Sequence, residues 1–160
     1  MKILIIEDDQ NKLQNLMNFI KQNYSQTEIT GKKSYHSGLT EVFEKKYDLI
    51  ILDMSMPTYD ITPSEPGGRP RAFAGREVLL QMRRKGIVTP IIVVTQFETF
   101  GENEDRMSLE QLRQQLKNLE KDRFNETIYY NSASDEWKVQ LKGSIENALN
   151  INNLKDDKQC

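Results

Sequence analysis

Short apolar runs alternate with longer amphipathic stretches along most of the chain. Three continuous runs are rich in isoleucine, leucine and valine: Ile3–Ile6, Leu49–Leu52 and Ile91–Val94. Each is too short for a helix, and continuous rather than alternating hydrophobicity indicates strands covered on both faces, as in a parallel sheet. Weaker strand patterns at Glu28–Lys32 and Thr127–Tyr130 bring the number of expected strands to five.

Between these runs, apolar residues recur at helical spacing and predict five amphipathic helices. Their apolar positions are Leu13, Leu16, Met17 and Ile20; Leu39, Val42 and Phe43; Val78, Leu79 and Met82; Leu109, Leu112, Leu116 and Leu119; and Trp137, Leu141, Ile145 and Leu149. Ser108 with Gln111 fits a capping box that opens the fourth helix. The β-α order predicts an α/β fold, a doubly wound sheet of five parallel strands with helices on both faces.

Two connections are longer than the ~2–6 residues of a usual βα loop. Residues 54–74 carry four prolines and the pair Gly67-Gly68, and residues 97–107 form a second, acidic loop. We expect residues 1–150 to form a single domain and residues 151–160 to form a polar tail.

Charge and cysteine content limit the classes of partner. The formal net charge is −2, so no global basic field favours nucleic acid or an anionic membrane. The apolar runs are far too short to span a bilayer. The single cysteine, Cys160, permits no internal disulfide, and there is no secretory signal pattern. We therefore expect a cytoplasmic protein without direct nucleic-acid or membrane contact.

Acidic and hydroxyl residues stand where the expected strands end. Glu7 and Asp8 follow the first strand, Asp53 follows the third and Thr95 follows the fourth. In open α/β sheets, ligand chemistry gathers at the carboxyl ends of strands. Neighbouring carboxylates raise each other's pKa unless they share a proton or a cation, and oxygen ligands of this kind suit Mg²⁺. With Mg²⁺ bound, Asp53 could attack a phosphoryl group and form an acyl phosphate.

Each of these residues also has a purely structural interpretation. Asp53 could form a turn or cap a helix, the acids from Glu7 to Asp9 could open the first helix, and Thr95 could be an ordinary strand residue. Their occurrence together at three strand ends favours the site.

Four segments resemble, in order and spacing, the receiver domain of two-component response regulators: KILIIEDD, DLIILDMSMP, GREVLLQMR and PIIVVTQ. The resemblance covers nearly the whole chain apart from the two long loops and the tail. It implies a flavodoxin-like fold, Mg²⁺ as cofactor, and a phosphoryl group supplied by a histidine kinase or a histidine phosphotransfer protein. It also implies signalling through a downstream protein that the sequence does not name.

The resemblance assigns a role to each matching residue. Glu7 and Asp8 correspond to the metal-binding acids, and Asp53 corresponds to the phosphoryl acceptor and a further metal ligand. Ser55 would offer its backbone carbonyl to the metal. Thr95 corresponds to the switch hydroxyl that moves toward the phosphoryl group.

Two departures from the family pattern bear on the chemistry. Receivers carry a lysine at the end of the fifth strand, and here that place is taken by Asn131, which can donate a hydrogen bond but brings no positive charge. The long loop at residues 54–74 contains Arg69 and Arg71, and one of them could supply the missing charge. We predict phosphate or lid contacts for these three residues.

Two functions are compatible with this pattern. The first is a stand-alone receiver that accepts a phosphoryl group on Asp53, with no catalysis beyond its own phosphorylation and dephosphorylation. The alternative is a pseudo-receiver, a protein-interaction module that works without phosphorylation. A 54–74 loop that fills the acidic pocket would favour the alternative. A flavin site is disfavoured because acids replace the phosphate-binding loop after the first strand, and no P-loop motif is present.

Overall fold

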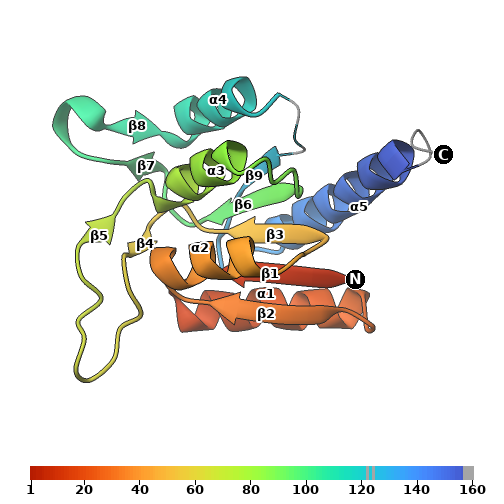
Figure 1. Ribbon diagram of the computed structural model, residues 1–160, viewed down its shortest axis with the longest axis horizontal. Helices are drawn as coiled ribbons and strands as arrows, with labels where there is room; N and C mark the ends of the chain where they lie inside the picture. Colours follow the sequence, from red (N-terminus) through yellow and green to blue (C-terminus); the bar gives the residue numbers. More distant parts are fainter. Residues whose placement is uncertain (122, 124, 157–160) are drawn as a thin grey trace.

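Five parallel strands form the central sheet in the computed structural model, which describes residues 1–121, 123 and 125–156 (Figure 1). The strands lie in the order β2-β1-β3-β6-β9, and all neighbouring pairs run parallel. Their bounds are β1 Lys2–Ile6, β2 Glu28–Lys32, β3 Leu49–Leu52, β6 Ile91–Thr95 and β9 Asn125–Tyr129. This sheet confirms the doubly wound fold, with the last strand beginning two residues earlier than its pattern indicates.

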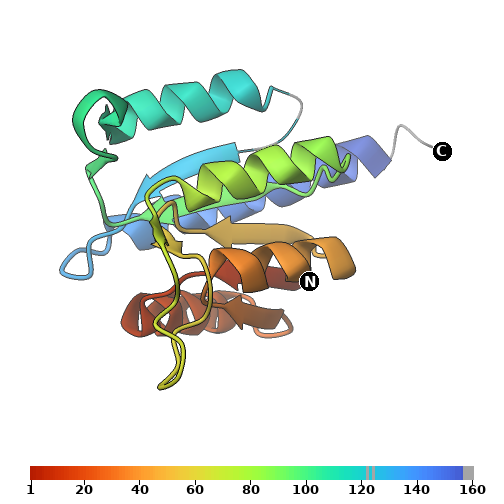
Figure 2. The same cartoon turned by 60° about the vertical axis from the view of Figure 1, so that its left-hand side comes forward.

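Five α-helices cover the two faces of the sheet. Helices α1 and α5 pack on one face, and α2, α3 and α4 pack on the other, as the turned view in Figure 2 shows. Their bounds are α1 Gln10–Asn23, α2 Tyr35–Glu44, α3 Ala74–Arg84, α4 Leu109–Leu119 and α5 Glu136–Asp156. Ser108 and Gln111 form the expected capping box of α4. None of the helices in the described part of the chain combines the length and hydropathy that a membrane span requires.

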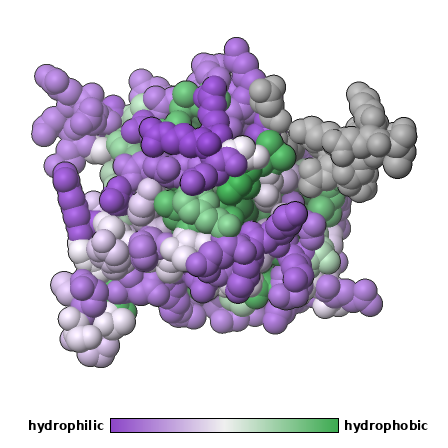
Figure 3. All heavy atoms as spheres, viewed as in Figure 1, coloured by the Kyte–Doolittle hydropathy of each residue, from purple (hydrophilic) through white to green (hydrophobic). Residues whose placement is uncertain are grey.

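The continuous apolar runs of the strands serve two cores at once. In β1, Ile3 and Ile5 face α1 and α5, whereas Leu4 and Ile6 face the other three helices. Successive side chains of a strand point to opposite faces, so a strand buried on both sides needs apolar residues throughout. The face of the molecule drawn in Figure 3 is mostly hydrophilic, with a patch of apolar atoms near its middle.

Helix α5 runs to Asp156, past Leu149 and into the segment that the sequence predicts as a polar tail. Residues 157–160 of that predicted tail lie outside the described residues.

Both long loops contain short antiparallel pairings that the sequence pattern does not indicate. In the first, β4 (Met56–Pro57) pairs with β5 (Pro70–Arg71). In the second, β7 (Thr99–Phe100) pairs with β8 (Met107–Ser108). Both hairpins extend from the carboxyl edge of the central sheet, at the left of Figure 1. Two-residue strands carry too little periodicity to be recognised from sequence, so only the folded chain reveals them.

Candidate functional site: a carboxylate cluster at the carboxyl edge of the sheet

Adjacent strand ends bring three acids together. Strands β1 and β3 are neighbours, with Ile6 opposite Leu52, so the residues that follow them leave the sheet side by side. One carboxylate oxygen from each of Glu7, Asp8 and Asp53 lies within 4.8 Å of the others. The side chains of Glu7 and Asp53 are buried, whereas Asp8 is exposed. These three acids therefore lie together at the carboxyl edge of the sheet, as the sequence predicts.

The backbone around Asp53 is fixed by the start of α3. The carboxylate Oδ1 of Asp53 accepts the N–H of Met54 at 2.6 Å. Gly75 donates its N–H to the carbonyl of Met54 at 3.0 Å. A Cβ at Gly75 would lie 2.4 Å from Leu52 Cδ1 and 2.6 Å from the Asp53 carbonyl oxygen, so only glycine permits this approach. The turn after β3 therefore presents the Asp53 side chain from a rigid support.

A lysine that the sequence analysis did not single out lies at the centre of the cluster. The Lys12 ammonium is 2.5 Å from Glu7 Oε2 and 3.1 Å from Asp53 Oδ2. It also donates to the carbonyl of Val94 in β6 at 2.7 Å. The side chain is only 1% exposed, which is rare for a lysine and requires charged partners. Lys12 thus links the ends of three adjacent strands from helix α1.

The position of Lys12 follows from the cap of its helix. Asp9 is the N-cap of α1, and its Oδ1 accepts the N–H of Lys12 at 2.9 Å. Lys12 stands one turn before Leu16, on the side of α1 that faces the sheet. A lysine at an inward helical position, just after an acidic run, was the signal available in the sequence. The three consecutive acids therefore have two roles: Asp9 caps the helix, whereas Glu7 and Asp8 form the carboxylate cluster with Asp53.

Within the described residues, three acids gather around Lys12, which pairs with Glu7 and Asp53. Burial, followed by the nearby charge of Asp53, raises the pKa of Glu7 to about 8, although Lys12 acts in the opposite direction. Partial desolvation and Asp53 also raise the pKa of Asp8. Because oxygen donors of net negative charge are the ligands that Mg²⁺ prefers, the cluster fits a divalent cation. A bound cation would hold these carboxylates in their ionised form.

A cavity of about 350 Å³ opens beside the acids. Its lining consists of Asp8, Asp9, Asp53, Ser55, Met56, Pro57, Ile61, Pro66, Gly68, Pro70, Gln96 and Phe97. Residues of the 54–74 loop form a wall of this cavity and leave it open. The condition that would have favoured a pseudo-receiver, a loop that fills the pocket, is therefore not met.

Thr95 ends β6 next to this cavity. It is fully buried, and its hydroxyl accepts the N–H of Phe97 at 3.3 Å. Its own carbonyl accepts the N–H of Tyr130, which follows β9. Gln96 and Phe97, directly after Thr95, line the cavity. Thr95 thus couples the cavity wall to the edge strand of the sheet.

The three residues predicted to contact phosphate do not line the cavity in this structure. Arg71 pairs with Glu77 at 2.5 Å and stacks over the ring of Tyr35. Arg69 is exposed. Asn131 is exposed, and its side-chain oxygen accepts the N–H of Ala133 at 3.0 Å. Contacts to a phosphoryl group from these residues remain predictions.

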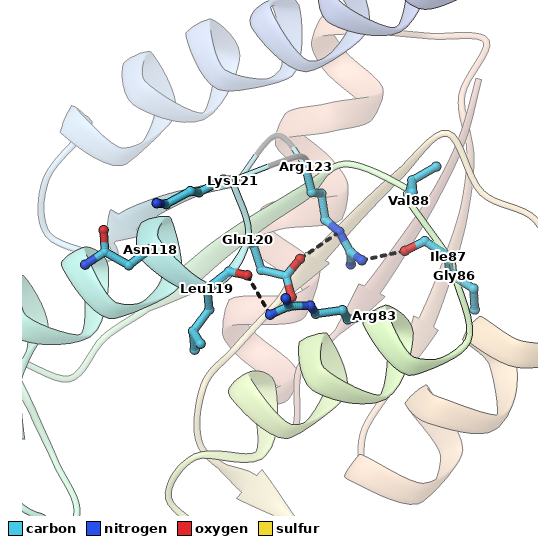
Figure 4. A pocket seen from close by; sticks show the side chains of 9 residues that line it. All are labelled: Arg83, Gly86, Ile87, Val88, Asn118, Leu119, Glu120, Lys121 and Arg123. Atoms are coloured by element: carbon cyan, nitrogen blue, oxygen red, sulfur yellow. Dashed lines mark hydrogen bonds and ion pairs between the residues drawn. The ribbon is translucent and has the colours of Figure 1, made fainter.

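A second charged cluster lies at the opposite, amino edge of the sheet, between α3, α4 and the start of β9 (Figure 4). Arg123 is buried, with its Nε 3.5 Å from Glu120 Oε2, and it donates to the carbonyl of Ile87 at 2.5 Å. Nearby, Arg83 donates to the carbonyl of Leu119 at 3.0 Å. These groups border a cavity of about 330 Å³ that contains one buried acid rather than several.

Comparisons with known proteins agree with this geometry. The family model of the response regulator receiver domain matches residues 3–129. The Detocs response regulatory protein DtcB of Enterobacter cloacae is 34% identical over 143 residues, which cover 88% of this chain and 95% of that protein.

Two solved structures share the fold. The signal receiver domain of a LuxO repressor protein from Vibrio parahaemolyticus has a TM-score of 0.68 at 19% identity, covering 99% of this chain and 97% of that one. Response regulator TrrA from Thermotoga maritima, in complex with Mg²⁺ and BeF, has a TM-score of 0.57 at 22% identity, with 89% and 97% covered. Sequence and fold thus agree, and the chain belongs to the response regulator receiver domain family.

Proposed function

We propose that this protein accepts a phosphoryl group on Asp53 from a phosphohistidine of a histidine kinase or a histidine phosphotransfer protein. The observation that carries the proposal is the convergence of Glu7, Asp8 and Asp53 within 4.8 Å, beside an open cavity of about 350 Å³. The DtcB relative, named a response regulatory protein, and the TrrA complex with Mg²⁺ and BeF support the same chemistry.

The transfer is a displacement at phosphorus. A carboxylate oxygen of Asp53 forms the new P–O bond while the P–N bond of the phosphohistidine breaks, and the imidazole takes up a proton as it leaves. Glu7, Asp8, Asp53 and the carbonyl of Ser55 would hold Mg²⁺, which supplies positive charge against the transferred oxygens. The rigid support of Gly75 keeps the Asp53 carboxylate in position during the displacement.

Thr95 connects the modified site to the surface. Its hydroxyl, which accepts the N–H of Phe97 in the structure, could donate to a phosphoryl oxygen once Asp53 is modified. That exchange would shift the segment at residues 96–108 and the neighbouring end of β9. A downstream protein that recognises this surface in the cytoplasm would then read the phosphorylation state.

Melting temperatures test this function. Wild-type protein with Mg²⁺ and beryllofluoride, a phosphoryl mimic, should melt roughly 5–10 °C higher than with Mg²⁺ alone, because ligand at about 100 times its Kd stabilises the native state. The Asp53→Asn variant should lose the beryllofluoride increment. Asp48→Asn, at an exposed position before β3, is the matched control and should keep it.

No beryllofluoride increment in the wild-type protein would refute the phosphorylation proposal and leave the pseudo-receiver, which interacts without phosphate. An increment of equal size in Asp53→Asn would show that the mimic binds elsewhere.

A further inference from the structure

We infer that Lys12, from the first turn of α1, supplies the positive charge that contacts the phosphoryl group on Asp53. This inference rests on the proposed function, because it concerns the same acceptor. It gives a residue of helix α1 the role of contacting the phosphoryl group. The family resemblance implies that a lysine at the end of the fifth strand has this role.

The geometry places the Lys12 ammonium against the acceptor itself. Nζ lies 3.1 Å from Asp53 Oδ2, close enough for a charge-assisted hydrogen bond. The carbonyl of Val94 fixes the ammonium from the β6 side at 2.7 Å, and the ring of Tyr130, after β9, lies 5.6 Å away. The charge of Lys12 therefore occupies the space between β3, β6 and the end of β9, where an acyl phosphate on Asp53 would need a counter-charge.

Lys12 is the counter-charge of the buried carboxylates Glu7 and Asp53, yet its position in the helix is unfavourable for a cation. Cations are disfavoured in the first turn of a helix, because the N-terminus carries the positive end of the helix dipole. Burying an ammonium also costs desolvation energy, which well-packed apolar residues would avoid. The desolvation cost of Lys12 is explained if its ammonium stabilises a group that gains negative charge. Asp53 is such a group, because phosphorylation increases its negative charge.

The described residues that line the cavity include three acids and neither lysine nor arginine. Lys12 itself lies outside that lining, and its ammonium reaches Asp53 from α1. Arg71 is engaged by Glu77, and Asn131 brings no charge. Lys12 is the cation that already touches Asp53 in the unmodified protein. Charge balance at the phosphorylated site thus points to Lys12.

The test separates metal binding from phosphoryl binding. The Kd of Mg²⁺ alone, and the Kd of beryllofluoride at saturating Mg²⁺, are measured for wild type, Lys12→Met and Lys21→Met. Lys21 is the matched control, an exposed lysine in the last turn of the same helix. We expect Lys12→Met to weaken beryllofluoride binding roughly 10–100-fold, as for loss of a hydrogen bond to a charged group, without weakening the binding of Mg²⁺. Lys21→Met should leave both constants unchanged.

Wild-type affinity for beryllofluoride in Lys12→Met would overturn the inference while the proposed function stands. Absence of beryllofluoride binding in the wild type would remove both.

A second measurement avoids dependence on a variant that fails to fold. The ¹⁵Nζ resonance of Lys12 in the wild-type protein, assigned through its own side chain, is followed as Mg²⁺ and then beryllofluoride are added. A contact with the mimic should move the resonance on the second addition, beyond any change caused by Mg²⁺. A resonance that responds to Mg²⁺ but not to beryllofluoride would contradict the inference.

Discussion

Two buried ionic clusters lie at opposite edges of the same sheet, and they differ in charge balance. At the carboxyl edge, Lys12 contacts both Glu7 and Asp53, and Asp8 adds a third acid beside an open cavity. At the amino edge, Arg123 faces the one carboxylate of Glu120.

The balance of charge distinguishes a ligand-binding site from a structural ion pair that only holds elements together. The Glu120–Arg123 pair is neutral as a whole, and the remaining donors of Arg123 reach Met82 Sδ and the carbonyl of Ile87. Its contacts join α3, α4 and the approach to β9. The carboxyl-edge cluster has an excess of negative charge when its three acids are ionised, which is costly in a buried site unless a cation arrives. Excess charge that borders a cavity is therefore the feature that marks the functional edge.

The largest expected difference between the clusters is in pH dependence. In the folded protein the pKa of Glu7 is about 8, against an ordinary value of 4.5, so the folded state holds more protons than the unfolded chain between these values. Stability without metal should therefore fall as pH rises from about 4.5 to 8, by at most on the order of 5 kcal/mol. Urea unfolding at a series of pH values measures this slope.

Glu7→Gln is the control for that slope, because its amide does not titrate. The variant should show a flatter pH profile over the same range. A profile as steep as that of the wild type would assign the protons to other groups.

Breaking the amino-edge pair should reduce stability without affecting the ligand site. Arg123→Met leaves Glu120 buried without its cation, and we expect the free energy of unfolding to fall by about 3 kcal/mol. The beryllofluoride increment in melting temperature should be unchanged, because the pair lies at the far edge of the sheet. Denaturant unfolding checks the first effect, with Lys121→Met at an exposed neighbouring position as the control.

A loss of the beryllofluoride increment in a folded Arg123→Met protein would show that the two edges are coupled. The distinction between a structural ion pair and a ligand-binding site would then need revision.

The smallest effect is expected from Arg71→Met, which tests the sequence-based hypothesis of a loop arginine. Its pair with Glu77 is partly exposed, so the loss in stability should be below about 1 kcal/mol. If Lys12 supplies the phosphate charge, the Kd of beryllofluoride should stay within about twofold of the wild type. Arg69→Met, at an exposed position of the same loop, is the matched comparison. A tenfold weakening confined to Arg71→Met would support the loop arginine instead.

The sequence by itself determined the sheet and the meeting of its acids. The runs at residues 3–6, 49–52 and 91–94 are local patterns, and a strand buried on both faces has few other interpretations. Once these strands are parallel neighbours, Glu7 and Asp53 must leave the same edge. That inference needs only chain order and the direction of the strands.

Only the tertiary structure decided which cation joins the acids. A lysine in an amphipathic helix is ordinarily solvated, and although its spacing from Leu16 places Lys12 on the inward side of the helix, that pattern does not identify the charges that its side chain meets. Its partners Glu7, Asp53 and Val94 are supplied by three different strands, up to 82 residues away in the chain. Arg123 follows this rule only in part, because its carboxylate partner Glu120 is three residues away, whereas Met82 and the carbonyl of Ile87 are 41 and 36 residues away. Strand patterns are local in the chain, whereas the partners of a buried charge are set by long-range packing, so folding alone assigns them.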